Sequence, residues 1–155
     1  VDGEFQLIVA NHLGSNASDQ GCLIPLLDDV KDILKTYPEQ CLADAGYRKE
    51  DDLQSLEDKR IDGYVSLRRE GKRSAEIDAS GYPATSRMAE KLATATGRSV
   101  YARRKHLVEA VNGWIKHILG FRQFSLRGLS AVQGEWDLAC LSLNLRRMSS
   151  LMRLT

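Results

Sequence analysis

The sequence has few cysteines, no long apolar run and none of the short motifs that mark common nucleotide or hydrolytic sites. No apolar stretch approaches the roughly 20 residues that a membrane-spanning helix needs, so no membrane association is expected. A glycine-rich phosphate loop, a nucleophile elbow and a paired-cysteine motif are all missing. Nucleotide hydrolysis, serine hydrolysis and a structural zinc site therefore have no support.

The three cysteines, Cys22, Cys41 and Cys140, are far apart and lie among apolar neighbours. We expect free buried thiols in a reducing compartment rather than a disulfide or a metal site. The chain opens on Val1-Asp2 with no initiator methionine and no signal peptide, directly before a strand-like stretch. This start suggests a fragment of a longer protein, and 155 residues are enough for one ordinary domain with a hydrophobic core.

Acidic residues are scarce in the C-terminal part of the chain. Residues 1–65 hold 14 acids and 6 bases, whereas residues 66–155 hold 7 acids and 16 bases. Glu109 is the only acid between Lys91 and Gln133. A mixed solvated surface and a basic half that meets a polyanion both account for this asymmetry, and charge alone leaves them equally supported.

The order of predicted elements favours an α/β layered domain with parallel strands. Apolar runs predict strands over residues 5–10, 40–43 and 63–67, and helical periodicity predicts helices over residues 20–36, 49–59, 86–96, 101–119 and 135–151. Ser18-Asp19 is an expected N-cap for the first helix, whose apolar face would include Ile33 and Leu34. The polar stretch 68–84 is expected to be a mobile surface loop.

The helix over residues 101–119 carries two different faces. At about 100° per residue, one broad stripe is apolar, and Tyr101, Lys105, Glu109 and Lys116 fall together on another. Glu109 is explained either as an i, i+4 ion-pair partner of Lys105 or as a functional carboxylate in a basic setting. His106 lies three residues before Glu109, a spacing used by metal-binding helices, but no second such motif exists and a surface histidine is favoured.

Asp44 follows a short apolar strand and precedes Ala45-Gly46-Tyr47. Ligands and catalytic groups collect at the carboxyl ends of parallel strands, but Asp-Ala-Gly is also an ordinary turn sequence. Taken with Glu109, Asp44 suggests a strand-end Asp and a helix Glu that hold two divalent cations for phosphoryl transfer.

Three separated blocks resemble the C-terminal part of the DDE transposases of bacterial insertion sequences. They are LADAGY at residues 42–47, KHLVEAVNGWIKH at residues 105–117 and GFRQFSLRGLSAVQGEWDLACLSLNLRR at residues 120–147. The resemblance covers nearly the whole chain, with the motifs in the right order. It implies an RNase H-like fold, a mixed sheet flanked by helices, in which an Asp, Asp and Glu triad binds two Mg²⁺ or Mn²⁺ ions.

The resemblance also implies roles for individual residues. Asp44 matches the second Asp and Glu109 matches the Glu, so both become metal ligands. The Tyr–Arg/Lys–Glu–Lys signature falls on Tyr101, Lys105, Glu109 and Lys116, where the spacing selects Lys105 rather than Arg104 as the basic member. Tyr101, Lys105 and Lys116 would contact DNA phosphates beside the metals. Two readings stay open for Arg103, Arg104, Arg122 and Arg127, which either extend this contact with the DNA backbone or are solvated surface residues.

The first Asp of the triad would lie on an earlier strand, upstream of the turn at Asp2-Gly3-Glu4, so the domain is expected to lack its first strand. Asp19 also recurs in the family pattern, and an N-cap role explains it. Trp114 and the pair Phe121 and Phe124 are expected to pack in a core, although the two phenylalanines could also stack on unpaired bases.

Two main hypotheses follow from the sequence. The first is a transposase catalytic fragment that acts on transposon ends and target DNA in the bacterial cytoplasm, with possible homo-oligomers, and that is inactive without the missing Asp. The second is a non-catalytic DNA-binding remnant of a decayed or repurposed transposase. A weaker third is an α/β domain with no role in DNA, for which the basic half is ordinary surface.

Overall fold

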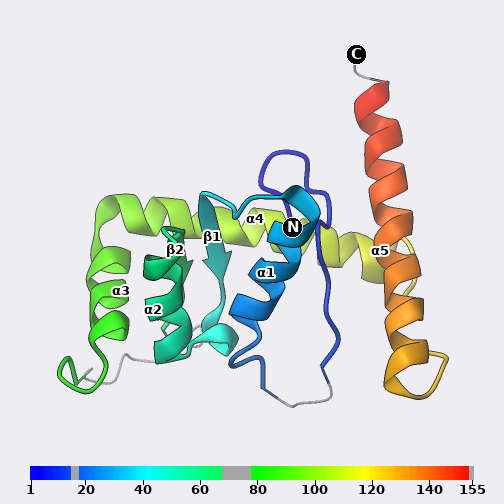
Figure 1. Ribbon diagram of the computed structural model, residues 1–155. Coiled ribbons are helices and arrows are strands. Elements are labelled where there is room, and N and C mark those ends of the chain that lie inside the picture. The colour runs from blue at the N-terminus through cyan, green and yellow to red at the C-terminus, as the bar shows by residue number, and fades with distance from the viewer. Residues whose placement is uncertain (15–17, 68–77, 154–155) are drawn as a thin grey trace. The chain divides into compact units, whose positions relative to one another are not determined.

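The computed structural model describes residues 1–14, 18–67 and 78–153. Their contacts divide the chain into two compact units, the central unit (Asn16–Arg104) and the terminal unit (Val1–Ser15 with Lys105–Thr155). The elements, in chain order, are α1 (Leu23–Leu34), β1 (Gln40–Ala43), the 3₁₀ turn η1 (Ala45–Tyr47), α2 (Glu50–Asp58), β2 (Asp62–Val65), α3 (Pro83–Ala93), α4 (Ala95–His117) and α5 (Leu129–Met152) (Figure 1). Among these described elements, no helix is both long and apolar enough to cross a membrane.

The central unit is built on two short parallel strands joined by α2. β1 pairs with β2 in a register that runs from Gln40 opposite Asp62 to Ala43 opposite Val65. α2 packs against β2 and α3, as Figure 1 shows, and its Leu53 and Leu56 are each only 1% exposed. The predicted β–α–β order, the parallel pairing and the inward face of α2 are therefore confirmed.

Gly63 on β2 allows this close packing. A Cβ placed on Gly63 would lie 2.6 Å from Cδ1 of Leu56, closer than real carbon contacts allow. The core of the central unit then extends through Val65, which is fully buried, to Leu23 and Leu27 of α1.

The strand predicted over residues 5–10 is not formed; the described part of the chain has two strands. This extended segment lies along α5 instead, where Asn144 exchanges two hydrogen bonds of 2.8 Å with the backbone of Ile8 and Arg147 donates to the Phe5 carbonyl at 2.7 Å. Side-chain amide and guanidinium groups thus take the place of a neighbouring strand. The turn expected at Asp2-Gly3-Glu4 is confirmed, because the Asp2 carboxylate accepts from the amides of Glu4 and Phe5.

Several helix boundaries differ from the predictions. α1 begins at Leu23 after Cys22, not at Gln20, so the N-cap role of Ser18-Asp19 is wrong. α4 begins at Ala95, ahead of Gly97, because the Thr94 hydroxyl accepts from the Gly97 amide at 2.9 Å and caps the helix there. α5 also begins earlier, at Leu129, after Gly128 in a left-handed conformation with φ of 86°. Gly120, at φ of 73°, follows α4 as expected.

Some apolar positions that periodicity assigned to the core are exposed. Ile33 and Leu34 are 58% and 51% exposed, because the buried cluster takes only Leu23 and Leu27 from α1. The three cysteines are free thiols as predicted, with only Cys140 fully buried. Desolvation raises the pKa of Cys41 and of Cys140 to about 11, so both thiols stay protonated at neutral pH.

Most of the stretch expected to be a loop, residues 68–77, lies outside the described residues. Its last part forms a turn in which the Asp78 carboxylate accepts from the amide and hydroxyl of Ser80 at 3.0 and 2.6 Å. α3 then begins at Pro83 rather than at Ser86. The Glu50 carboxylate of α2 caps this helix, accepting from the amides of Ala84 and Thr85 at 2.6 and 3.0 Å and from the Thr85 hydroxyl at 2.6 Å.

This cap predicts a pH-dependent contribution to stability. Partial burial alone would raise the pKa of Glu50, but its bonds from Thr85 and Ala84 outweigh burial and hold the pKa below its usual value. The ionised cap therefore stabilises the fold above the unfolded-state pKa and is lost as pH falls through the lower folded-state pKa. We expect Glu50→Gln to lower the free energy of unfolding by about 1 kcal/mol at pH 7, and by less as pH falls below about 4. Urea unfolding of the wild type and of Glu50→Gln, at pH 7 and below pH 4, measures this difference in stability.

Asp51→Asn is the matched control, because Asp51 lies in the same first turn but has an 80% exposed side chain. It reports any general effect of removing a negative charge from this helix terminus. An equal decrease in the free energy of unfolding for Glu50→Gln and Asp51→Asn at pH 7 would show that the cap on α3 adds nothing to stability.

Candidate functional site

Asp44 lies directly after β1 and shapes the turn that follows. Its Oδ1 accepts a hydrogen bond from the Gly46 amide at 2.9 Å and so caps η1. The turn-forming role expected from the sequence is therefore real. The side chain still keeps 49% of its surface exposed, so its carboxylate remains available to a ligand at the strand end.

A second carboxylate, that of Asp19, lies beside Asp44. A Cβ on Gly46 would be 2.9 Å from Asp19 Oδ2 and 3.0 Å from Asp44 Oδ1, so the two oxygens are at most the sum of these distances, about 6 Å, apart. Burial first, and then the charges of Asp19 and Asp44, raise the pKa of the neighbouring Tyr47 phenol. The sequence predicts a helix cap for Asp19. The structure places it beside Asp44 instead, and the only sequence signal for this is Gly46, whose missing Cβ leaves space for two acids.

Arg104 of α4 is the basic side chain next to Asp44. Its Nη1 lies 3.8 Å from Asp44 Oδ2, and its guanidinium carbon lies 5.7 Å from the centre of the Tyr101 ring. Tyr101 and Arg104 are neighbours on one helix face at i, i+3 spacing. Lys105, which the signature spacing selected, is exposed and makes no ion pair with any described residue.

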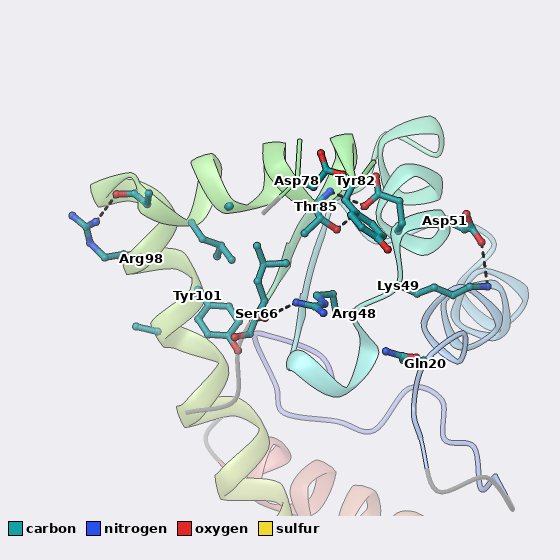
Figure 2. A pocket seen from close by; sticks show the side chains of 16 residues that line it. Gln20, Arg48, Lys49, Asp51, Ser66, Asp78, Tyr82, Thr85, Arg98 and Tyr101 are labelled. Atoms are coloured by element: carbon teal, nitrogen blue, oxygen red, sulfur yellow. Dashed lines mark hydrogen bonds and ion pairs between the residues drawn. The ribbon is translucent and has the colours of Figure 1, made fainter. Parts of the chain in front are cut away.

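An open cavity of about 1040 Å³ lies in the central unit at the carboxyl end of β2. Figure 2 shows Tyr101 on one side, near Ser66 and Arg48, and Tyr82 beside Thr85 on another. Arg48 is held in place by the bond from its Nη1 to the Leu67 carbonyl at 2.9 Å. Tyr101 therefore contributes to two features of this unit, because it lines the cavity and also lies next to Arg104, which pairs with Asp44.

Glu109 lies in the terminal unit, in the middle of α4, and is exposed. Neither Lys105 nor Lys116 forms an ion pair with it in the part of the chain that the structure describes, so the simple i, i+4 explanation gains no support. Lys105, Lys116 and Arg103 are likewise exposed.

The opposite face of α4 forms the core of the terminal unit. Val111 and Ile115 are buried with Leu143 of α5, and Trp114 packs against this cluster as predicted. Ile118 and Leu119, which the stripe also assigned to the core, are 62% and 39% exposed because α4 ends at His117.

The connector between α4 and α5, residues 118–128, has a defined conformation. Phe121 contacts the cluster and meets Trp136 at 5.9 Å between ring centres, while Phe124 meets Phe121 edge to face at 5.3 Å. Core packing is thus confirmed for Phe121, whereas Phe124 stays 40% exposed. Arg122 contacts Nδ1 of His117 at 3.2 Å, and both Arg122 and Arg127 are exposed.

No cluster of three or more His, Cys, Asp or Glu side chains that could hold a metal ion occurs within residues 1–14, 18–67 and 78–153. The pair Asp19 and Asp44 supplies two carboxylates near each other, which suits the preference of Mg²⁺ for oxygen ligands and for few protein carboxylates. Glu109 belongs to the other compact unit.

Comparison with known proteins supplies the family. A family model described as a transposase DDE domain matches residues 66–149, which include Glu109 and the connector but not Asp44. The searches of curated proteins and of solved structures gave no significant match. Domains of this kind act on DNA and generally use divalent metal ions. Because the match covers more than half of its residues, the chain belongs to the DDE transposases, a family whose reaction is the cleavage and transfer of DNA strands in transposition.

Proposed function

We propose that the chain is part of the RNase H-like catalytic domain of an insertion-sequence transposase, to which both compact units belong. It hydrolyses DNA at transposon ends and joins the resulting 3′-OH to target DNA. The observation that carries the proposal is the family match across the Glu109 helix, together with Asp44 at the end of a strand in a parallel sheet. The small helix-flanked sheet is compatible with such a domain.

Asp44 and Glu109 are the proposed metal ligands, and Asp19 is added as a further carboxylate at the same strand end. Two divalent ions bound at such a site activate the attacking water or hydroxyl and stabilise the leaving oxygen. The role of the protein is to present carboxylate oxygens at fixed positions. For Asp44 this is achieved by its bond to the Gly46 amide, which holds one oxygen while the other faces Arg104.

The basic side chains are proposed to hold DNA phosphates near this chemistry. Arg104 has the best-supported position, because its guanidinium lies 3.8 Å from Asp44 Oδ2 and 5.7 Å from the centre of the Tyr101 ring. With a divalent cation held by Asp44, the Arg104 guanidinium would be available to a phosphate oxygen, which its planar fork fits. The wider set of proposed phosphate contacts is Tyr101, Lys105, Lys116, Arg103, Arg122 and Arg127.

The family pattern includes a further Asp, which the proposal assigns to no residue of this chain. Assembly of several copies on DNA also belongs to the proposal. The alternative is a non-catalytic DNA-binding remnant, for which the same basic surface would suffice. Metal affinity separates the two, since a remnant has no need to keep carboxylates that bind divalent ions.

Binding of Mn²⁺ to the chain tests the proposed ligands directly. We expect Asp44→Asn to weaken Mn²⁺ binding at least about tenfold, because even loss of a group that only supports a metal ligand costs that much. Asparagine keeps an oxygen that can accept from the Gly46 amide, so the turn should persist. Asp19→Asn should weaken binding as well. Electron paramagnetic resonance of free Mn²⁺ gives the affinities.

Asp29→Asn is the control, because Asp29 is an exposed acid on α1 of the same unit. Equal Mn²⁺ affinity for the wild type, Asp44→Asn and Asp19→Asn would remove this strand end from the proposed metal site.

A further inference from the structure

We propose that the connector between α4 and α5, together with the first residue of α5, forms a wedge whose apolar side chains insert between DNA bases and distort the duplex. These side chains are Phe124 and Leu126 of the connector and Leu129 of α5. The inference rests on the proposed DNA-binding function and adds the mode of contact. It assigns to these three residues a role that differs from metal binding and from phosphate contacts.

The tip of the connector exposes large apolar side chains at closely spaced positions. Phe124 is 40% exposed, and Leu126 and Leu129 are each 53% exposed. Single exposed apolar residues are normal on soluble proteins, but a group of them within six residues marks an interaction surface.

The tip is held in shape by contacts to its own unit. The Glu135 carboxylate of α5 accepts from the Ser125 amide at 2.9 Å and from the Leu126 amide at 3.1 Å. These backbone bonds lower the pKa of Glu135, so it stays ionised at neutral pH. Phe124 rests edge-on against Phe121, which in turn meets Trp136. An apolar group that is pre-positioned in this way loses little conformational freedom when it inserts into a partner.

The charges around the tip favour DNA as the partner. Arg122 and Arg127 lie on either side of Phe124 and Leu126 in the chain and are exposed, and no acidic residue occurs from 110 to 134. Proteins that kink DNA combine these features: Phe, Leu, Ile or Met side chains enter a base step while basic side chains bind the flanking backbone. All charged side chains from residue 110 to residue 134 are basic, and the nearest acid, Glu135, is engaged by the Ser125 and Leu126 amides. An apolar protein partner would not require this run of basic charge.

Duplexes that carry 2-aminopurine at successive positions, with a fluorophore pair at their ends, report both base unstacking and bending. We expect the wild-type chain to raise 2-aminopurine fluorescence severalfold at one or two adjacent positions. At saturating protein, Leu126→Ala and Phe124→Ala should lose most of this increase and of the bend. Their affinity should fall by less than about tenfold and their salt dependence should stay the same, because the arginines that release counterions remain.

Further variants separate the wedge from the charge around it. Glu135→Ala removes the positioning carboxylate and should reduce unstacking while retaining most affinity. Arg127→Gln should do the reverse: the slope of log affinity against log salt should become less negative by about one, while unstacking at saturation persists. Leu138→Ala is the matched control, because Leu138 is 65% exposed on α5 outside the connector, and it should behave as the wild type.

Three outcomes would overturn the proposal. DNA binding with no unstacking at any position, or with unstacking that Leu126→Ala and Phe124→Ala leave unchanged, would overturn the wedge alone and leave the DNA-binding function standing. Failure to bind any duplex at low salt would overturn both. Circular dichroism of each variant confirms that the helices remain folded.

Discussion

In a transposase that contains this chain, Glu109→Gln is expected to lower the rate of DNA strand cleavage about 1000-fold. Metal-ion catalysis supplies several kcal/mol of transition-state stabilisation, and each 1.36 kcal/mol corresponds to about a factor of ten in rate. Glutamine keeps the size and helix propensity of glutamate but removes the charge that a divalent ion needs. Because Glu109 is exposed and makes no ion pair with a described residue, the substitution should not unfold the protein. Cleavage of a labelled transposon end in Mg²⁺ measures the effect.

Glu90→Gln provides the control, since Glu90 is also an exposed glutamate within a helix, on α3 of the central unit. It should cleave at the wild-type rate. A similar rate for Glu109→Gln would remove Glu109 from the metal site. The 155-residue chain alone should cleave no DNA; Mg²⁺-dependent cleavage by it that Asp44→Ala abolishes would show that the catalytic set is complete without an upstream Asp.

The parts of the fold that the sequence predicted well are those in which local pattern and burial agree. The stretch from β1 to β2 combines short apolar strands with a helix whose two leucines, Leu53 and Leu56, face one side, and it was placed almost to the residue. The same pattern predicted the position of Asp44, because a residue that directly follows a strand lies at the end of that strand.

The N-terminal segment shows why pattern alone was insufficient. An apolar run such as residues 5–10 is compatible with any partner that satisfies its backbone, and the sequence does not say whether that partner is a strand or a helix side chain. Here Asn144 satisfies the backbone of Ile8 from a position 136 residues away. A contact at that separation leaves no local signal.

The candidate site shows the same limit at the level of single residues. Asp19 and Arg104 were assigned from their sequence neighbours, one to a helix cap and the other to a general basic surface. Their relation to Asp44 comes from tertiary packing: Gly46 leaves room for Asp19, and α4 brings Arg104 to 3.8 Å from Asp44 Oδ2 and next to the Tyr101 ring. The residue types predicted carboxylate and phosphate chemistry, but the partners of each group were set by packing.

Leu56→Ala is expected to be strongly destabilising and to lower the free energy of unfolding by about 3 kcal/mol. The side chain is 1% exposed and fills the space beside Gly63, so its removal leaves a cavity against the backbone of β2. The loss includes both the transfer free energy of the missing methyl groups and the cavity that remains. Denaturant unfolding followed by circular dichroism measures the change.

Ile33→Ala is the informative comparison, because helical periodicity places Ile33 on the buried face of α1 whereas the structure leaves it 58% exposed. A surface substitution of this kind should change the free energy of unfolding by no more than about 0.5 kcal/mol. If Ile33→Ala cost as much as Leu56→Ala, the core would have to extend over the C-terminal turn of α1. The stability difference between these two variants therefore tests whether the core of the central unit is confined to the first half of α1, the two strands and the helices α2 and α3.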